Sequence, residues 1–356
     1  MTNITSKSTH SIRWQRELAK AFNDLGELLS WLELDHLALD DPLLSASLQA
    51  AEGFPLRVPH DYADRIEKGN PRDPLLLQVL PRSSEMDWVP GFVDDPVGDQ
   101  EAECDDGMLR KYTGRALLIT TGACAVHCRY CFRRNYPYQE SHVSSTDPKQ
   151  TIAYIKQHRD INEVILSGGD PLSLNDRKLS PLLQQLDAIP HVQRLRIHTR
   201  TPIVLPSRID QPFIDSIKQI KKPVTIVVHC NHPNELSSTV IDKLKKLKNI
   251  GVQLLNQSVL LRGVNDDAHT LIRLSERLFD SGVLPYYLHM LDPVNGAAHF
   301  EVDELTALDL IQQIRQSLSG YLVPKLVREV TGAASKIAVT ENSVLPCTQI
   351  EEHITI

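Results

Sequence analysis

RALLITTGACAVHCRYCF, residues 115–132, sets a short apolar run directly before three closely spaced cysteines. The run at 115–120 has the length and composition of a buried strand, and Cys124, Cys128 and Cys131 occupy the loop after it. Thiolates separated by three and two residues can reach three corners of a cubane cluster from one compact loop, which leaves the fourth iron without a protein ligand. We therefore predict a 4Fe-4S site at the end of this strand.

Five further apolar runs follow, each bounded by turn residues and separated from the next by enough chain for a helix. They lie at residues 163–169, 194–199, 223–230, 251–260 and 284–291. Such runs suit strands that are buried on both faces, and their alternation with helices indicates βα units with right-handed crossovers. We predict an α/β fold, a partial parallel (βα)6 barrel, whose ligands collect at the carboxyl ends of the strands.

The residues before the alternating strands and helices differ in composition and in apolar spacing. An apolar rhythm of about 3.6 residues over 11–34 predicts one or two amphipathic helices. Residues 56–106 are rich in prolines, acidic residues and short apolar pieces, which is typical of connecting structure. We therefore divide the chain into an N-terminal helical and wrapping region at 1–110, the barrel with its last loop at 111–340, and a short tail at 341–356.

Overall charge and cysteine content limit the kind of function. The 38 basic and 45 acidic residues give a net charge of −7, which argues against charge-driven binding to nucleic acid or to an anionic membrane. Residues 1–10 lack the apolar segment of a secretory signal, and no later stretch approaches the length of a membrane span. The six cysteines lack the spacing of a disulfide-rich domain, so we expect metal or redox chemistry in the cytoplasm.

Two other interpretations of the cysteine triplet stay open at this level. Cysteines can be small buried residues, and a zinc site could take His127, inside the same loop, as its fourth ligand. The remaining cysteines, Cys104, Cys230 and Cys347, are isolated in the sequence. Because the loop follows a strand that opens a parallel barrel, the cluster is the favoured interpretation.

The run CAVHCRYCF at 124–132 resembles the signature of radical S-adenosylmethionine enzymes, with Tyr130 as the aromatic residue beside the last cysteine. The resemblance implies that the amine and carboxylate of S-adenosylmethionine chelate the fourth iron. One-electron reduction would then cleave the sulfonium and give a 5'-deoxyadenosyl radical. The hard chemistry belongs to the cofactors, and the protein positions and shields the radical.

Other residues of the radical enzyme's site follow from the same resemblance. The loop after the second predicted strand is implied to bind S-adenosylmethionine, with exposed backbone groups meeting the methionine amine; it contains Ser167, Gly168, Gly169 and Asp170. His229 and Gln257, which we expect to end the fourth and fifth strands, match positions near the adenosyl group.

A closer resemblance extends over residues 111–339. It is carried, in order, by KYTGRALL, CAVHCRYCFRR, ILSGGDPL, LNQSVLLRGVND, PYYLHMLDPVNGAAHF and GYLVPKLVREVTGAASK. Together these motifs look like a lysine 2,3-aminomutase, and most like the branch that supplies β-lysine for the modification of elongation factor P. The resemblance implies an isomerase that converts L-α-lysine to β-lysine, with the R enantiomer as the expected product.

Pyridoxal 5'-phosphate is the further cofactor that this resemblance implies. Lys336, at the end of GAASK, falls on the family's lysine that forms a Schiff base with it, although a glycine run often stands in place of residues 333–335. Arg115 and Lys111 fall on positions that bind the phosphate. Lys111 replaces a more familiar arginine, which keeps the charge but loses the planar fork.

Substrate recognition is implied by three charged residues. Arg133, two residues past the last cysteine, matches the arginine that pairs with the lysine carboxylate, a task suited to its bidentate guanidinium. Asp292 and Glu329 match the two acids that bind the side-chain ammonium, and Glu329 adds a methylene to the family's aspartate.

The resemblance also implies partners, and it leaves alternatives. A one-electron donor such as flavodoxin or ferredoxin would reduce the cluster, and an elongation factor P β-lysine ligase would use the product. Only Cys347 follows Lys336, so we expect no C-terminal zinc module. An aminomutase that makes free β-lysine for metabolism is the second interpretation, and an iron-sulfur electron carrier or sensor without turnover is the third.

Overall fold

The computed structural model describes residues 11–35, 53–105, 107–138 and 148–340 of the chain. One sheet forms its centre, and the strands of this sheet follow one another in sequence order. Residues 1–10 and the predicted tail at 341–356, which contains Cys347, lie outside the described residues.

All six predicted strands are present and pair in parallel, which confirms the predicted fold class. They are β3 (Arg115–Ile119), β4 (Glu163–Ser167), β5 (Arg194–Thr199), β6 (Val224–Val228), β7 (Gln253–Val259) and β8 (Leu284–His289). A further parallel strand that the sequence patterns did not predict, β9 (Lys325–Arg328), pairs with β8. Short antiparallel strands form both edges: β1 (Glu103–Asp105), β2 (Met108–Leu109) and β10 (Ile337–Ala338).

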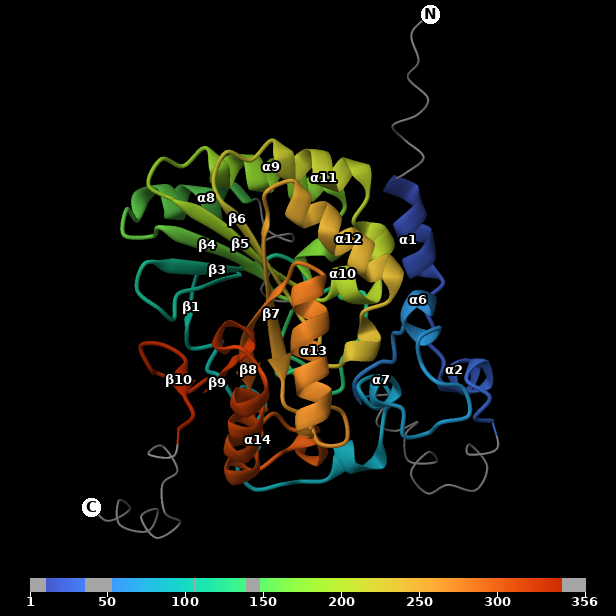
Figure 1. Ribbon diagram of the computed structural model, residues 1–356. Helices are drawn as coiled ribbons and strands as arrows, with labels where there is room; N and C mark the ends of the chain where they lie inside the picture. Colours follow the sequence, from blue (N-terminus) through green and yellow to red (C-terminus); the bar gives the residue numbers. More distant parts are fainter. Residues whose placement is uncertain (1–10, 36–52, 106, 139–147, 341–356) are drawn as a thin grey trace, which may run out of the picture.

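Helices fill the crossovers and lie along the outer side of the sheet (Figure 1). The longer ones are α8 (Pro148–Gln157), α9 (Asp176–Asp187), α11 (Gln211–Lys218), α12 (Ser238–Asn249), α13 (Ala268–Asp280) and α14 (Glu304–Ser317). Shorter helical turns are η2 (Pro171–Ser173), α10 (Thr201–Val204), η3 (Pro206–Arg208), η4 (Pro233–Glu235), η5 (Ala298–Phe300) and η6 (Gly320–Leu322).

Side-chain caps mark where several of these helices begin. Asn175, Ser237, Asp267 and Asp303 each accept a hydrogen bond from the backbone N–H three residues further on, at the starts of α9, α12, α13 and α14. The first-turn N–H groups of a helix have no partner inside the helix, so a capping oxygen stabilises the start of the helix by about 1 kcal/mol. The caps thereby determine where each crossover loop ends and its helix starts.

The two faces of the strands differ. In β5, Leu195 and Ile197 are fully buried under the helices, whereas Arg194, Arg196 and His198 line an internal cavity. Alternate residues of a strand point to opposite faces, so the polar members of RLRIHT all face inward. The inner face of this strand therefore carries polar side chains that line the cavity.

The N-terminal region supplies the two helices expected from its apolar rhythm, α1 (Ser11–Ala19) and α2 (Leu25–Trp31), followed by α6 (His60–Ala63), α7 (Pro74–Leu77) and η1 (Ser83–Met86). Figure 1 shows the α-helices of this region on one side of the barrel, in blue. Their apolar side chains share one core with Ala125 and Val126 of the cysteine loop. The region therefore packs directly on the loop that carries the cysteines.

The proposed boundary at residue 110 crosses the sheet, because β2 pairs with β3. No helix in the described ranges has both the length and the apolar character needed to cross a bilayer.

Candidate active site in the barrel

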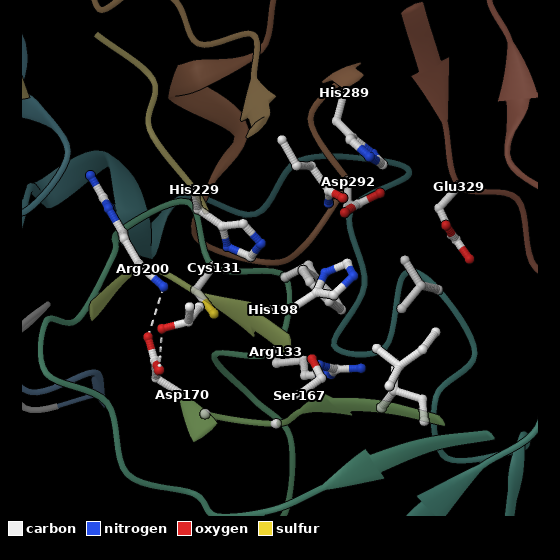
Figure 2. Close-up of a pocket in the computed structure, with 18 of the residues that line it drawn as sticks. Cys131, Arg133, Ser167, Asp170, His198, Arg200, His229, His289, Asp292 and Glu329 are labelled. Carbon is white, nitrogen blue, oxygen red and sulfur yellow. Dashed lines mark hydrogen bonds between the residues drawn. The ribbon is translucent and has the colours of Figure 1, made fainter. Parts of the chain in front are cut away.

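A cavity of about 860 Å³ lies inside the barrel. It is lined by inward-facing strand residues and by the loops at the strand ends (Figure 2). Every predicted site residue lines it: Lys111, Arg115, Cys124, Cys128, Cys131, Arg133, Ser167, Gly168, Gly169, Asp170, His229, Gln257, Asp292, Glu329 and Lys336. The structure thus brings residues that are up to 225 positions apart in the sequence to one site (336 − 111 = 225).

The glycine pair after β4 allows two backbone segments to meet. The backbone N–H of Gly169 donates to the carbonyl of Thr121 at 2.7 Å, and that of Asp170 donates to the carbonyl of Ala123 at 2.8 Å. A Cβ atom on Gly169 would stand 2.5 Å from the Ala123 carbonyl oxygen. These N–H groups hold the cysteine loop, and the glycine is required because no side chain fits between the segments.

Asp170 has a structural task as well. Its carboxylate accepts hydrogen bonds from Thr199 Oγ1 at 2.6 Å and from the backbone N–H groups of Leu172, Arg200 and Thr201 at 2.8–2.9 Å. It therefore ties the end of β4 to the end of β5. With four donors on this carboxylate, Asp170 holds the shape of the site rather than offering a free acceptor.

The three cysteines form a donor set that fits an iron-sulfur cluster. Burial raises the pKa of Cys124 well above its ordinary value and raises that of Cys131 to about 11. Such thiols ionise when a metal compensates their charge, as the irons of a cluster do. His127, the alternative ligand of a zinc site, is instead engaged with the carbonyl of Pro55 at 2.8 Å and stacks on Phe54.

Arg133 is bound to an acid that the sequence patterns did not reveal. Its Nε donates to Asp99 Oδ2 at 2.6 Å, and its NH1 donates to Ser167 Oγ at 3.0 Å. The ammonium of Lys111 lies 2.6 Å from the other oxygen of Asp99. Burial raises the pKa of Asp99, but the two cations outweigh burial and hold the pKa below its ordinary value. A charged carboxylate thus bridges the residues predicted for the substrate carboxylate and for the phosphate.

Lys336 and Glu329 form an ion pair at the carboxyl end of β9. Tyr112 donates its hydroxyl to the same carboxylate. Burial raises the pKa of Glu329, but Lys336 and Tyr112 outweigh this and lower the pKa below its ordinary value. Asp292 stands nearby without a side-chain hydrogen bond to any described residue, and burial raises its pKa to about 7. The region therefore has two acids and one amine.

Arg115 opens β3, so it lies at the amino end of the strands. Its guanidinium is 5.2 Å from the centre of the Tyr112 ring and 3.9 Å from Glu163, and it remains partly exposed. Arg196 also lines this part of the cavity, and its Nε has no hydrogen-bond partner. The cavity thus extends along the strands, because inward-facing residues at both strand ends line it.

Three imidazoles face the cavity, the buried His289 and the partly buried His198 and His229 (Figure 2). Burial lowers the pKa of His229 to about 4 and holds the other two well below the ordinary value, so all three are neutral. The Nε2 atom of each has no hydrogen-bond partner in the protein. Buried polar atoms are normally paired, so these atoms fit a site that binds a polar ligand.

His229 directly follows β6, close to the predicted strand end, but Gln257 does not end its strand. Gln257 lies within β7, opposite Tyr287 of β8. The fifth predicted run continues beyond Gln257 to Leu260, so Gln257 falls inside the strand. Gln257 nevertheless lines the cavity, because its position in the alternation turns it inward.

Sequence reasoning missed several cavity residues that can meet a ligand: Asp99, Tyr112, Arg196, His198 and His289. For Arg196 and His198 a signal existed, since polar residues occupy every second position of RLRIHT. Asp99 gave no signal, because it lies in an irregular acidic segment where an exposed acid is the common outcome.

Comparison with known proteins agrees with this arrangement. The sequence profile of the radical SAM superfamily matches residues 118–274, which include the cysteine loop and β4 to β7. The L-lysine 2,3-aminomutase of Escherichia coli is 47% identical over 337 residues, covering 94% of this chain and 97% of that protein. The chain belongs to the lysine 2,3-aminomutase family. A second member, from Haemophilus influenzae, is 44% identical over 92% of this chain and 96% of that protein.

More distant members of the lysine 2,3-aminomutase family include the Clostridium subterminale enzyme, which is 33% identical over 83% of this chain and 71% of that protein. Membership makes the chain a radical SAM isomerase, and the superfamily implies a 4Fe-4S cluster and S-adenosylmethionine. The loop with Cys124, Cys128 and Cys131 supplies the thiols that such a cluster needs.

Proposed function

We propose that this aminomutase converts L-α-lysine to (R)-β-lysine and uses pyridoxal phosphate in addition to the cluster and S-adenosylmethionine. The observation that carries the proposal is one cavity lined by the three cysteines, by Lys336, and by charges of both signs. S-adenosylmethionine supplies the radical, and pyridoxal phosphate supplies a π-system beside the migrating amine. The chain's own residues must hold these groups and the substrate in contact while excluding water.

Lys336 is the proposed attachment point for pyridoxal phosphate. Its amine is paired with Glu329 and reaches the cavity, so it is both oriented and close to the site where the cofactor would lie. Arg115 and Lys111 are the proposed phosphate ligands. Arg196 is a third cation that lines the cavity; its NH2 pairs with Glu163 at 3.2 Å, and its Nε has no partner. This concentration of cations supports a phosphate site.

Substrate lysine would span the cavity between opposite charges. Arg133 would pair with its carboxylate through the guanidinium nitrogens that Asp99 does not engage. Asp292 and Glu329 would receive the side-chain ammonium. The present pairing of Lys336 with Glu329 is a carboxylate–ammonium contact of the kind that we propose for the substrate.

The cofactor S-adenosylmethionine would lie over the end of β4, beside Ser167, Gly168, Gly169 and Asp170. His229 and Gln257 would meet its adenosyl group, and the unpartnered Nε2 of His229 supports such a contact. In this arrangement the radical carbon would lie between the cysteines and Lys336, beside the proposed substrate site.

We further propose that the product serves the modification of elongation factor P through a β-lysine ligase, and that flavodoxin or ferredoxin reduces the cluster. Identity to the Escherichia coli and Haemophilus influenzae relatives, 47% and 44%, exceeds the 33% to the Clostridium subterminale protein, which supports this branch. Free thiols at all five described cysteines suit a reducing compartment, so we propose a cytoplasmic location.

The test is anaerobic reconstitution with iron and sulfide, followed by chiral analysis of the product from L-lysine, pyridoxal phosphate and S-adenosylmethionine. We expect (R)-β-lysine from the wild-type protein and none from Lys336→Ala, with Lys325→Ala, an exposed lysine of the neighbouring strand, as the active control. Formation of β-lysine by an intact Lys336→Ala variant would refute the assignment.

The fate of β-lysine distinguishes its use for elongation factor P from its production as a free amino acid for metabolism. Labelled β-lysine should reach elongation factor P when the ligase is added to the reaction. If label accumulates only as the free amino acid in cells that contain the ligase, the metabolic alternative is correct. If the protein holds a cluster but binds neither pyridoxal phosphate nor S-adenosylmethionine, it is an electron carrier or sensor.

A further inference from the structure

A buried arginine contacts one of the cluster cysteines. Arg200 follows the last residue of β5, and its side chain is only 6% exposed. Its NH1 donates to the sulfur of Cys128 at 2.7 Å. Within the described part of the chain, no side-chain donor reaches the sulfur of Cys124 or Cys131. The three thiols are therefore unequal, and Cys128 alone among them has a cationic side-chain partner in these residues.

The guanidinium of Arg200 is held in place from several sides. NH2 donates to Gln78 Oε1 at 2.7 Å and to Glu235 Oε2 at 3.0 Å. The rings of Tyr62 and Tyr130 lie 5.6 and 5.5 Å from its central carbon, within range of cation–π contact. We call Tyr62, Gln78, Tyr130 and Glu235 the Arg200 cage. Side chains that are fixed in this way keep the hydrogen bond to Cys128 without further loss of entropy.

The Arg200 cage is assembled from separate parts of the fold. Tyr62 and Gln78 come from the N-terminal region, and Glu235 comes from η4, after β6. The backbone N–H of Arg200 donates to Asp170, which Figure 2 shows near Cys131. Asp170 also donates its backbone N–H to the carbonyl of Ala123 at the start of the cysteine loop, so one residue contacts both Arg200 and that loop.

Glu235 is completely buried and makes further contacts. Its Oε1 accepts the backbone N–H groups of Asn231 and His232 at 2.9 and 3.0 Å. Burying an arginine and a glutamate costs several kcal/mol of desolvation, and apolar side chains of similar size would often be as stable. Stability alone thus gives no reason for this pair at the wall of the cluster site.

The positive charge of Arg200 affects the reduction potential of a cluster bound by Cys128. Reduction adds one electron and makes the cluster and its thiolates more negative. A cationic donor beside a ligand sulfur stabilises the reduced form more than the oxidised form, so it raises the reduction potential. The interaction is strong here because water is excluded from Arg200. A carboxylate behind the guanidinium offsets part of this effect.

We propose that Arg200 raises the reduction potential of the cluster through its hydrogen bond to Cys128, and that Glu235 limits this rise. Arg200 acts as a positioning and tuning residue, since it touches the ligand sulfur and not the substrate. In the step concerned, one electron passes from an external low-potential one-electron donor to the cluster, and no bond or proton is exchanged at Arg200. The inference requires the cluster but not lysine, so it stands apart from the proposed reaction.

The test measures the midpoint potential of the reconstituted cluster by EPR-monitored redox titration, without lysine or pyridoxal phosphate. Arg200→Gln should lower the reduced-to-oxidised ratio about tenfold at a given potential, which corresponds to about 59 mV for one electron. Glu235→Gln, which removes the opposing charge, should raise the reduced-to-oxidised ratio. If the two residues were merely structural, their variants would not change the potential in opposite directions.

Arg208→Gln is the matched control. Arg208 is also completely buried and paired with an acid, Asp176 at 2.6 Å, but it does not line the cavity. Its loss should leave the potential unchanged. The proposal is overturned if Arg200→Gln keeps the wild-type potential with full cluster content, or if both cage variants change it in the same direction. If Arg200→Gln takes up no cluster, the midpoint potential of Glu235→Gln is the deciding measurement. A lower or unchanged potential in Glu235→Gln then refutes the proposal.

Discussion

Asp99 Oδ2 lies 2.6 Å from Nε of Arg133, and both side chains are almost fully buried. The contact links the irregular N-terminal region to the second residue after Cys131, the last cysteine ligand. It also determines which guanidinium nitrogens remain for a ligand, because Nε is taken by Asp99 and NH1 by Ser167.

Asp99→Asn should therefore weaken both stability and lysine binding. Removing one partner of a buried ion pair leaves charges uncompensated, which costs about 3 kcal/mol of unfolding free energy. Arg133 would also lose its fixed orientation, so the KM for lysine should rise while cluster content is retained. Denaturant unfolding and initial-rate kinetics measure the two effects. Asp94→Asn, at an exposed acid of the same segment, is the control and should behave like the wild type. A wild-type KM in a folded Asp99→Asn variant would contradict this role.

Asp292 should make lysine binding depend on pH. Burial raises its pKa to about 7, so the carboxyl is largely protonated below that pH and charged above it. An ammonium group binds the charged form, so affinity for lysine should rise as pH increases through about 7 and then level off. Asp292→Asn should bind lysine weakly, without this rise. Calorimetric titration of the cofactor-loaded protein between about pH 6 and 8.5 measures it, in a range where the lysine ammonium keeps its proton. A flat wild-type profile would count against the assignment.

Glu329→Gln should separate charge from hydrogen bonding at the other acid. Glu329 accepts from both Lys336 and Tyr112, and a glutamine keeps the size but not the charge. Loss of one charged hydrogen bond to the substrate ammonium corresponds to about a tenfold rise in KM for lysine. Glu329→Asp, which keeps the charge on a shorter side chain, should be less affected. A loss in Glu329→Asp with none in Glu329→Gln would show that length, not charge, governs this contact.

Gly169→Ala should disrupt the cysteine loop. The added Cβ would stand 2.5 Å from the Ala123 carbonyl oxygen, and backbone on both sides cannot move away cheaply. Overpacking of this kind costs about 1–3 kcal/mol, and the displaced loop should bind less iron. Iron and sulfide analysis after reconstitution checks the second effect. Gly320→Ala is the control, because a Cβ at that position meets nothing within 4 Å. Full cluster content in Gly169→Ala would show that the loop tolerates displacement.

Local sequence patterns were enough to predict the cysteine loop and the strands that surround the site. The cysteine triplet, the six parallel strands and the polar residues that follow them are read from neighbouring residues, because strand length, alternation and thiol spacing are local properties. The strand β9 escaped detection because KLVR is short and only half buried, although it positions Glu329. Resemblance to a known family supplied Lys336, Arg133 and Asp292, whose roles no local pattern identifies.

By itself, the sequence determined which chemical groups are available: three thiols on one loop, one lysine after small residues, and alternating polar positions on the inner strands. Only the tertiary structure decided their pairings. Asp99 meets Arg133, Arg200 meets Cys128, and Glu329 meets Lys336 through contacts between separate elements. Such contacts depend on how strands and loops from distant parts of the chain converge on one cavity, and burial then determines the charge state of each group.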